Sequence, residues 1–104
     1  MAPFQSPPTI KLSRLRDIGW SLWDPIGLLK PGQRWEDEEC RSFADEYDTY
    51  LLNAAEQLRR GVATSTVIAY LVDIEANYMG LGQRPDTHER ANSLVGAINA
   101  DSLL

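Results

Sequence analysis

Apolar residues recur along this chain at steps of three and four, the spacing that gathers them on one face of an α-helix. The first stripe lies between residues 12 and 23 and consists of Leu15, Ile18 and Leu22. Asp24 and Pro25 end it, because the residue before a proline is driven out of the helical conformation. A helix over residues 12–23 is therefore expected, with Ser13 or Thr9 as its N-terminal cap.

Three sequence signals agree in predicting a second helix: acidic residues at its start, an apolar stripe along one face, and a glycine after its end. The acidic residues at positions 36–39 place negative charge at a helix N-terminus, where the helix dipole favours it. The apolar stripe that follows consists of Cys40, Phe43, Tyr47, Leu51, Ala54 and Leu58. Arg59 and Arg60 fall in the last turn, and Gly61 stands where a left-handed cap is expected. We expect one continuous helix from residue 36 to residue 60.

The third apolar stripe is the widest of the four. It opens at Thr64 or Ser65, closes at Gly80, and contains Val67, Ile68, Tyr70, Leu71, Val72, Ile74 and Tyr78. Because the pattern continues beyond residue 72, it indicates a helix, while the β-forming run 67–72 leaves a short buried strand as the alternative. So wide an apolar face predicts the central, most buried helix of the fold.

A fourth helix is expected to begin at Asp86, with Glu89 three residues later as its capping-box partner. Its apolar stripe consists of Ala91, Leu94, Val95 and Ile98. The four segments together predict an all-α fold, a compact bundle of about four helices. We expect a single helical domain over residues 9–104, preceded by a flexible tail over residues 1–8 that holds three prolines.

Composition and targeting signals narrow the class of protein. Cys40 is the single cysteine, which excludes an intrachain disulfide and a cysteine-based zinc finger. The longest apolar run, residues 67–72, is far shorter than the roughly 20 residues that span a bilayer, and the N-terminus lacks the apolar segment of a signal peptide. We therefore expect a cytoplasmic protein that does not enter membranes.

Residues 15–28, which contain the signature Trp-Asp-Pro-Ile-Gly at positions 23–27, form the most distinctive stretch of the sequence. This stretch resembles the opening of a group of small bacterial helical proteins that carry the same signature and are mostly of unknown function. Residues 45–51, 70–75 and 79–81 are also similar to that group, so the resemblance covers about residues 12–82. It implies a small helical fold in a bacterial cytoplasm, and some of these proteins look like immunity partners of bacterial toxins.

The same signature has a purely structural interpretation. Asp24 can cap the turn that follows it, Pro25 is pre-set for the first turn position, and Gly27 is free to adopt a positive φ. Trp20 and Trp23 would then pack beneath the turn. The alternative is that the signature belongs to a recognition surface.

Charge is distributed unevenly along the chain, whose formal net charge is −5. Residues 1–35 carry five basic and two acidic residues, whereas residues 36–104 carry five basic and thirteen acidic residues. The acidic balance argues against nucleic-acid binding and favours a basic protein partner. We expect no catalytic residue and no cofactor, and we regard five residues as interaction candidates: Trp20, Trp23, Asp24, Trp35 and Tyr70.

Trp35 is the candidate most expected to be exposed, because a small bundle can bury two tryptophans more easily than three. His88 is expected on the surface and Cys40 in the core, where acidic neighbours would raise the pKa of the thiol. The wide third stripe would leave Ile68 or Tyr70 outside the bundle, beside Leu81. Such a patch predicts a weak homodimer.

The alternative function is a Mg²⁺-dependent helical nucleotide hydrolase. Helical enzymes of this kind bind the metal with paired carboxylates, and this chain offers Glu36 with Glu39 and Asp45 with Asp48 at the required spacing. Both pairs lie in one short run, however, whereas Mg²⁺ requires ligands that converge. A solvated acidic face is therefore the preferred interpretation, and no metal site is expected.

Overall fold

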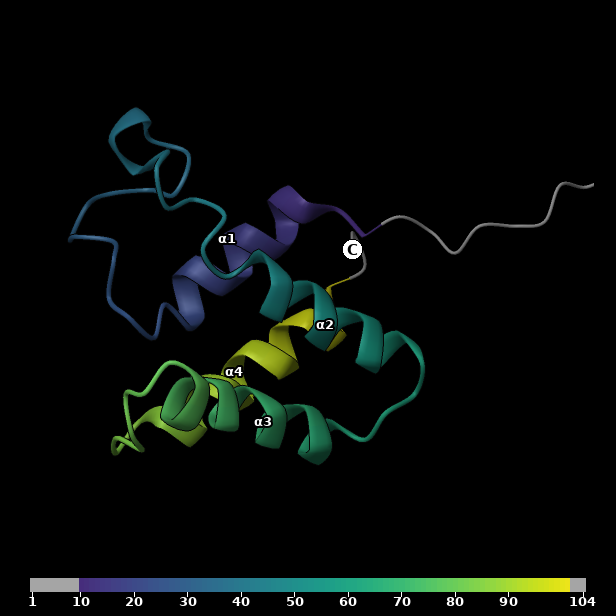
Figure 1. The fold of residues 1–104 in the computed structure, drawn as a ribbon. Coiled ribbons are helices and arrows are strands. Elements are labelled where there is room, and N and C mark those ends of the chain that lie inside the picture. Colours follow the sequence, from purple (N-terminus) through teal and green to yellow (C-terminus); the bar gives the residue numbers. More distant parts are fainter. Residues whose placement is uncertain (1–9, 102–104) are drawn as a thin grey trace, which may run out of the picture.

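The computed structural model describes residues 10–101, which form an all-α bundle of four α-helices (Figure 1). The helices are α1 (Leu12–Leu22), α2 (Asp48–Arg59), α3 (Thr64–Asp73) and α4 (Thr87–Ala100). A short 3₁₀ turn, η1 (Glu38–Cys40), precedes α2, and a π-helical turn, η2 (Ile74–Tyr78), continues α3. The predicted fold class is confirmed. The expected tail over residues 1–8 lies outside the described residues, as does Thr9.

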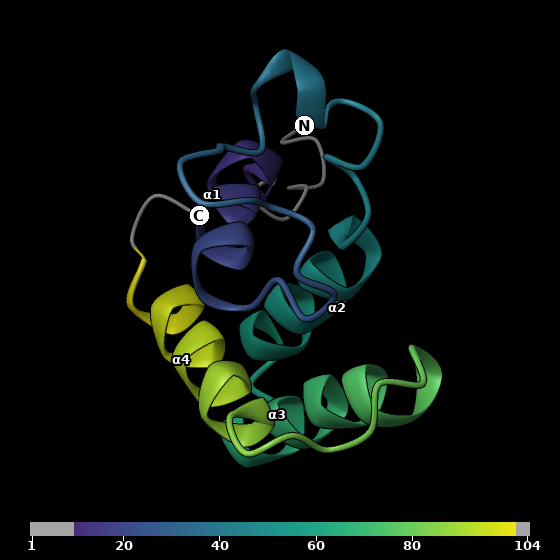
Figure 2. The same ribbon diagram turned by 90° about the vertical axis from the view of Figure 1, so that its left-hand side faces the viewer.

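The helices are stacked so that α2 and α4 form the middle of the bundle. Each of these two helices packs against α1, against α3 and against the other. Helix α1 lies at one edge and α3 at the opposite edge (Figure 2). The prediction that α3 is the central helix is therefore wrong: it buries Val67, Ile68 and Leu71, while Tyr70 and Val72 stay half-buried. In the described part of the chain, no helix has both the length and the apolar character needed to cross a membrane.

A single apolar core joins all four helices. Its fully buried members include Leu15 from α1, Leu51 from α2, Leu71 from α3 and Leu94 from α4. Helices α1 and α2 approach closely at Gly19, where an added Cβ would lie only 2.6 Å from a methyl carbon of Leu51. This glycine costs helix stability, and the close approach of α1 and α2 is what it allows.

The second predicted helix is only half correct. A regular helix begins at Asp48, whereas residues 37–48 form successive tight turns in which an amide donates to the carbonyl three residues earlier. Two contacts with α1 hold this segment: the Trp20 indole donates to the Ala44 carbonyl at 3.3 Å, and Arg16 pairs with Asp48 at 2.6 Å. The stripe still marks burial correctly at Cys40 and Tyr47, which are fully buried. Gly61 adopts a φ of +84° after α2, as expected of a left-handed cap.

The third predicted helix is confirmed against the strand alternative, but it does not end as a regular α-helix. From Ile74 onward the backbone widens, and the Met79 amide donates to the carbonyl of Ile74, five residues earlier. Glu75 is fully buried in this wider turn, whereas Tyr78 lies outside, with 72% of its surface exposed. The sequence placed Tyr78 on the buried stripe, and this prediction is wrong.

The predicted Ser13 cap of α1 and the predicted capping box of α4 do not form. Helix α1 has Lys11 at its N-cap position, where the described residues 10–101 supply no side-chain cap bond, and Ser13 lies inside the helix. Helix α4 begins after Asp86 as predicted, but the capping box with Glu89 is absent because the Asp86 carboxylate binds Arg90 instead. The α4 N-terminus is held by Thr87, whose hydroxyl accepts the Arg84 amide at 2.8 Å.

Candidate functional site

The distinctive residues 23–27 form a closed turn whose polar groups bond to one another. Asp24, at a φ of +25°, accepts the amides of Leu28 and Leu29 at 3.0 and 3.1 Å, and Gly27 adopts a φ of +74°. The Tyr47 hydroxyl donates to the Asp24 carboxylate at 2.8 Å and accepts the Ile26 amide at 3.1 Å. Burial and the bond to Asp24 raise the pKa of Tyr47 well above its usual range. Asp24 therefore caps the turn as predicted.

A buried carboxylate, Glu75, fastens this turn to α4. Arg90 donates to both of its oxygens, at 2.8 and 2.7 Å, and Thr87 and Arg84 donate to Oε2 at 2.8 and 3.0 Å. The same two arginines reach the backbone of the turn, Arg84 at the Pro25 carbonyl (2.6 Å) and Arg90 at the Trp23 carbonyl (3.2 Å). This carboxylate holds the bundle and the turn together.

The ionisation of Glu75 reflects two opposing effects. Burial raises the pKa of the Glu75 carboxyl, whereas the hydrogen bonds from Arg90, Thr87 and Arg84 lower it and prevail, so that the pKa lies below its ordinary value. Sequence reasoning missed this residue. The available signal was its position, because Glu75 continues the four-residue steps of the buried Val67 and Leu71.

Two of the candidate tryptophans lie inside the protein. Trp20 and Trp23 are 5% and 2% exposed, and the buried indole nitrogen of Trp23 has no hydrogen-bond partner among residues 10–101. Neither ring offers a surface to a partner in this conformation. Their burial leaves Trp35 as the partly exposed tryptophan, as expected.

Trp35 is half-buried and already engaged with residues of α1. Its indole nitrogen donates to Asp17 at 2.8 Å, and the guanidinium of Arg16 lies 5.2 Å from its ring centre. Arg16 in turn pairs with Asp48 at 2.6 Å. The ring therefore already binds a cation of its own chain, which is held in place by a carboxylate.

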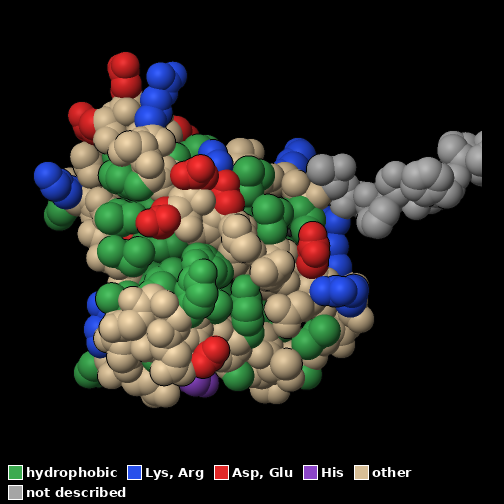
Figure 3. Space-filling view, viewed as in Figure 1, with side chains coloured by type: hydrophobic (Ala, Val, Ile, Leu, Met, Phe, Trp, Pro, Cys, Tyr) green, Lys and Arg blue, Asp and Glu red, His purple; other side chains and the backbone are tan. Residues whose placement is uncertain are grey.

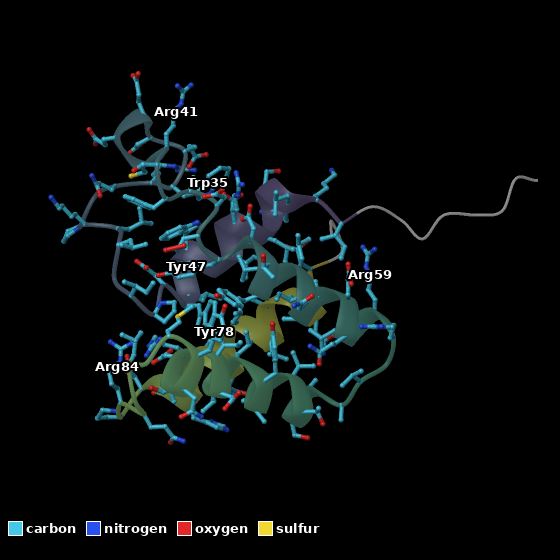
Figure 4. The ribbon with its side chains drawn as sticks, in the orientation of Figure 1. Trp35, Arg41, Tyr47, Arg59, Tyr78 and Arg84 are labelled. Atoms are coloured by element: carbon cyan, nitrogen blue, oxygen red, sulfur yellow. The ribbon has the colours of Figure 1, made fainter. Side chains whose placement is uncertain are left out.

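Aromatic rings form a continuous chain from the interior to the surface of the bundle. It runs through Phe43, Trp20, Tyr47, Trp23, Tyr50 and Tyr78, with ring centres 4.6–6.3 Å apart. Tyr78 is its exposed end and lies at the centre of the face seen in Figure 4. Figure 3, in the same orientation, shows hydrophobic side chains gathered there, with acidic side chains above and below them.

We call the surface formed by Tyr50, Tyr70, Tyr78 and Glu46 the tyrosine face. The Tyr70 hydroxyl accepts a hydrogen bond from the side-chain amide of Asn53 at 3.2 Å. Asn53 lies on α2, one helical turn after Tyr50. The pKa of Tyr50 is raised, first by burial and then by Tyr78, Glu46 and Tyr70, so these three groups act on Tyr50. Of the predicted interaction residues, the structure thus brings only Tyr70 to this surface. The sequence did not single out Tyr78.

The carboxylates proposed for a metal do not converge. Glu36 pairs with Arg34 and Asp48 with Arg16. Among residues 10–101 there is no group of three or more His, Cys, Asp or Glu side chains able to hold a metal ion. Cys40 is fully buried, and burial, followed by the charges of Asp37 and Glu39, raises the pKa of its thiol. His88 is exposed at the rim of an open groove of about 470 Å³ between α3 and α4.

Comparison of the chain with known protein families, with curated proteins and with solved structures finds no match.

Proposed function

We propose that this chain is a non-enzymatic protein-binding domain that recognises a basic protein partner through the tyrosine face. The observation that carries the proposal is the exposure of Tyr78, 72% of whose surface is open although its ring continues the aromatic chain of the core. Tyrosine is enriched among the residues that contribute most to protein interfaces. An immunity or inhibitor-like role toward a basic bacterial protein is one form of this function.

Rigidity supports the choice of this surface over the acidic turns at residues 36–47. The Tyr78 ring packs against Tyr50 at 5.9 Å, and Tyr50 packs against the buried Trp23 at 6.3 Å. A side chain that is already held in place loses little conformational entropy when a partner covers it. Tyrosine also combines a large apolar area with a polar tip, which suits a surface exposed to water until the partner binds.

Charge supports a basic partner. The chain carries a net charge of −5, and the exposed Glu46, whose charge contributes to the raised pKa of Tyr50, lies in the turn before α2. An acidic surface attracts a basic partner over a distance of about 8–10 Å in physiological salt and accelerates its association. Complex formation should therefore weaken as salt is added.

The test is capture from the native cell extract, with wild-type protein and Tyr78→Ala compared side by side and bound proteins identified by mass spectrometry. We expect a basic protein that is retained by wild type at low salt, released by salt, and lost with Tyr78→Ala. Leu22→Ala, which removes exposed apolar surface from α1, is the matched control and should retain the partner. Equal capture by wild type and Tyr78→Ala would contradict the assignment.

In the predicted homodimer, a second copy of this chain would cover the tyrosine face in place of another partner. Light scattering coupled to size exclusion measures the mass of the protein at high micromolar concentration. The proposal expects the mass of one chain. A dimer that Tyr78→Ala converts to a monomer would instead assign the tyrosine face to a second copy of this chain.

A further inference from the structure

We propose that Tyr50 and Tyr78, together with Glu46, form a subsite for one cationic side chain of the partner, an arginine or a lysine. This inference rests on the proposed function and names the chemical group that the tyrosine face receives. The groups come from separate parts of the fold: Glu46 from the turns before α2, Tyr50 from α2, and Tyr78 from the end of η2.

The two rings have the geometry of adjoining walls. Their centres lie 5.9 Å apart and their planes meet at 67°, so the edge of one ring is directed toward the other. Because Tyr78 is largely exposed, its ring is accessible from solvent, while Trp23 supports Tyr50 from within at an angle of 75°. Cations bind over the faces of aromatic rings within about 6 Å of the ring centre, and recessed sites for ammonium groups are built from several such rings.

Electrostatics favour a cation over a neutral apolar group at this place. Both Glu46 and the negative faces of the rings attract positive charge. The pKa of Tyr50 is raised first by burial and then by Tyr78, Glu46 and Tyr70, so the negative charge of Glu46 acts at this ring. Acidic side chains above and below the hydrophobic centre of this face extend the negative surroundings (Figure 3).

The protein already contains a complete example of this chemistry at Trp35. There the Arg16 guanidinium lies 5.2 Å from the ring centre, and Asp48 binds the same guanidinium at 2.6 Å. A ring, a cation and a carboxylate are thus combined within one chain. At the tyrosine face the chain supplies the rings and the carboxylate, and we assign the cation to the partner.

Substitutions at Tyr78 separate cation binding from simple apolar contact. Tyr78→Phe keeps the aromatic face and should bind the captured partner within about twofold of wild type. Tyr78→Leu keeps apolar area but loses the ring, and should weaken binding about two- to fivefold relative to Tyr78→Phe. Glu46→Gln should also weaken binding, whereas Glu56→Gln, which removes an exposed carboxylate further along α2, is the matched control and should not. Equal affinity of the Phe and Leu variants would overturn the subsite.

A peptide probe tests the same subsite without the natural partner. The peptide acetyl-(Gly-Arg)₄-amide is titrated into ¹⁵N-labelled full-length protein and compared with the same peptide containing citrulline, which is nearly isosteric and uncharged. We expect the arginine peptide to shift the resonances of Tyr50 and Tyr78, and the citrulline peptide to leave them unchanged. Equal shifts with both peptides, or none with the arginine peptide at millimolar concentration, would overturn the inference.

The two experiments keep the two proposals apart. If Tyr78→Ala abolishes capture while Phe and Leu variants bind equally, the protein-binding function stands and the cationic subsite is wrong. If no partner depends on Tyr78 but the arginine peptide still shifts Tyr50 and Tyr78, the subsite exists and the proposed function is wrong.

Discussion

The closed turn at residues 23–27 and the tyrosine face differ in how their polar groups are satisfied, although the same aromatic chain links them. In the turn, Asp24 accepts two backbone amides and a tyrosine hydroxyl, and two arginines of the Glu75 cluster bind its carbonyls. At the tyrosine face, Tyr78 stays mostly exposed. The most distinctive sequence thus serves the fold, whereas the surface that we propose for a partner lies elsewhere in the chain, around Tyr50 and Tyr78.

A comparison of two tyrosines, Tyr47 at the closed turn and Tyr78 at the tyrosine face, shows the same difference in burial and hydrogen bonding. The Tyr47 ring is fully buried and its hydroxyl makes two hydrogen bonds with residues of the turn. Within the described part of the chain, the Tyr78 ring packs against one aromatic ring, that of Tyr50, and is otherwise largely open to solvent. If the comparison is correct, changes at the turn should cost stability, and changes at the tyrosine face should cost binding alone.

The largest effect is expected from Glu75→Gln. The neutral side chain removes the fully buried carboxylate that pairs with Arg84 and Arg90. Breaking a buried pair costs up to about 3–5 kcal/mol, and we expect about 3 kcal/mol here because both arginines are partly exposed and Arg90 keeps its bond to Asp86. Urea denaturation should show this loss in the free energy of unfolding. Glu89→Gln, which changes an exposed carboxylate on α4, is the control and should change stability by less than about 0.5 kcal/mol. A loss below about 1 kcal/mol for Glu75→Gln would show that the cluster does not hold the turn.

Lowering the pH should gradually remove the stability that the Glu75 carboxylate contributes. Because the folded-state pKa of Glu75 lies below its ordinary value, its stabilising effect is fully present above the unfolded pKa of about 4.3 and is lost as the pH falls through the folded pKa. The difference in unfolding free energy between wild type and Glu75→Gln should therefore be constant between about pH 5 and 7 and shrink below about pH 4. A difference that does not change between neutral and acidic pH would mean that Glu75 is not ionised in the folded protein.

Tyr47→Phe should have an intermediate effect. It removes the hydroxyl that donates to Asp24 and leaves the Ile26 amide without its acceptor, at a cost of about 1–2 kcal/mol. Tyr78→Phe is the matched control, because it removes a hydroxyl from an exposed ring, and its unfolding free energy should equal that of wild type. Equal losses in the two variants would remove the contrast between the turn and the tyrosine face.

Tyr78→Ala should have the smallest effect on stability, within about 1 kcal/mol of wild type, because most of the side chain is already in water. Thermal unfolding followed by circular dichroism measures it. The variant should lose partner capture while it retains the wild-type melting temperature to within a few degrees. A variant that unfolds early would place Tyr78 in the structural core of the bundle instead.

The sequence alone determined the features that depend on local conformation. The Asp24–Pro25 pair ends α1, and Gly27 and Gly61 adopt the left-handed conformations expected of them. These outcomes follow from steric rules that involve only a few neighbouring residues. Apolar spacing also identified four helical segments and placed Cys40 and Tyr47 in the core.

The tertiary structure decided where the backbone of each apolar stripe forms a regular α-helix and where it forms tighter or wider turns. The stripe through residues 40–58 is interrupted where Trp20 binds the Ala44 carbonyl and Arg16 binds Asp48. In η2, bonds to the fifth residue back rotate Tyr78 outward and turn Glu75 toward Arg84 and Arg90, which follow it by nine and fifteen residues. Apolar periodicity indicates the positions that a regular α-helix would bury, and it does not distinguish helical turns of slightly different width. That small difference put Tyr78 on the surface, and with it the candidate site.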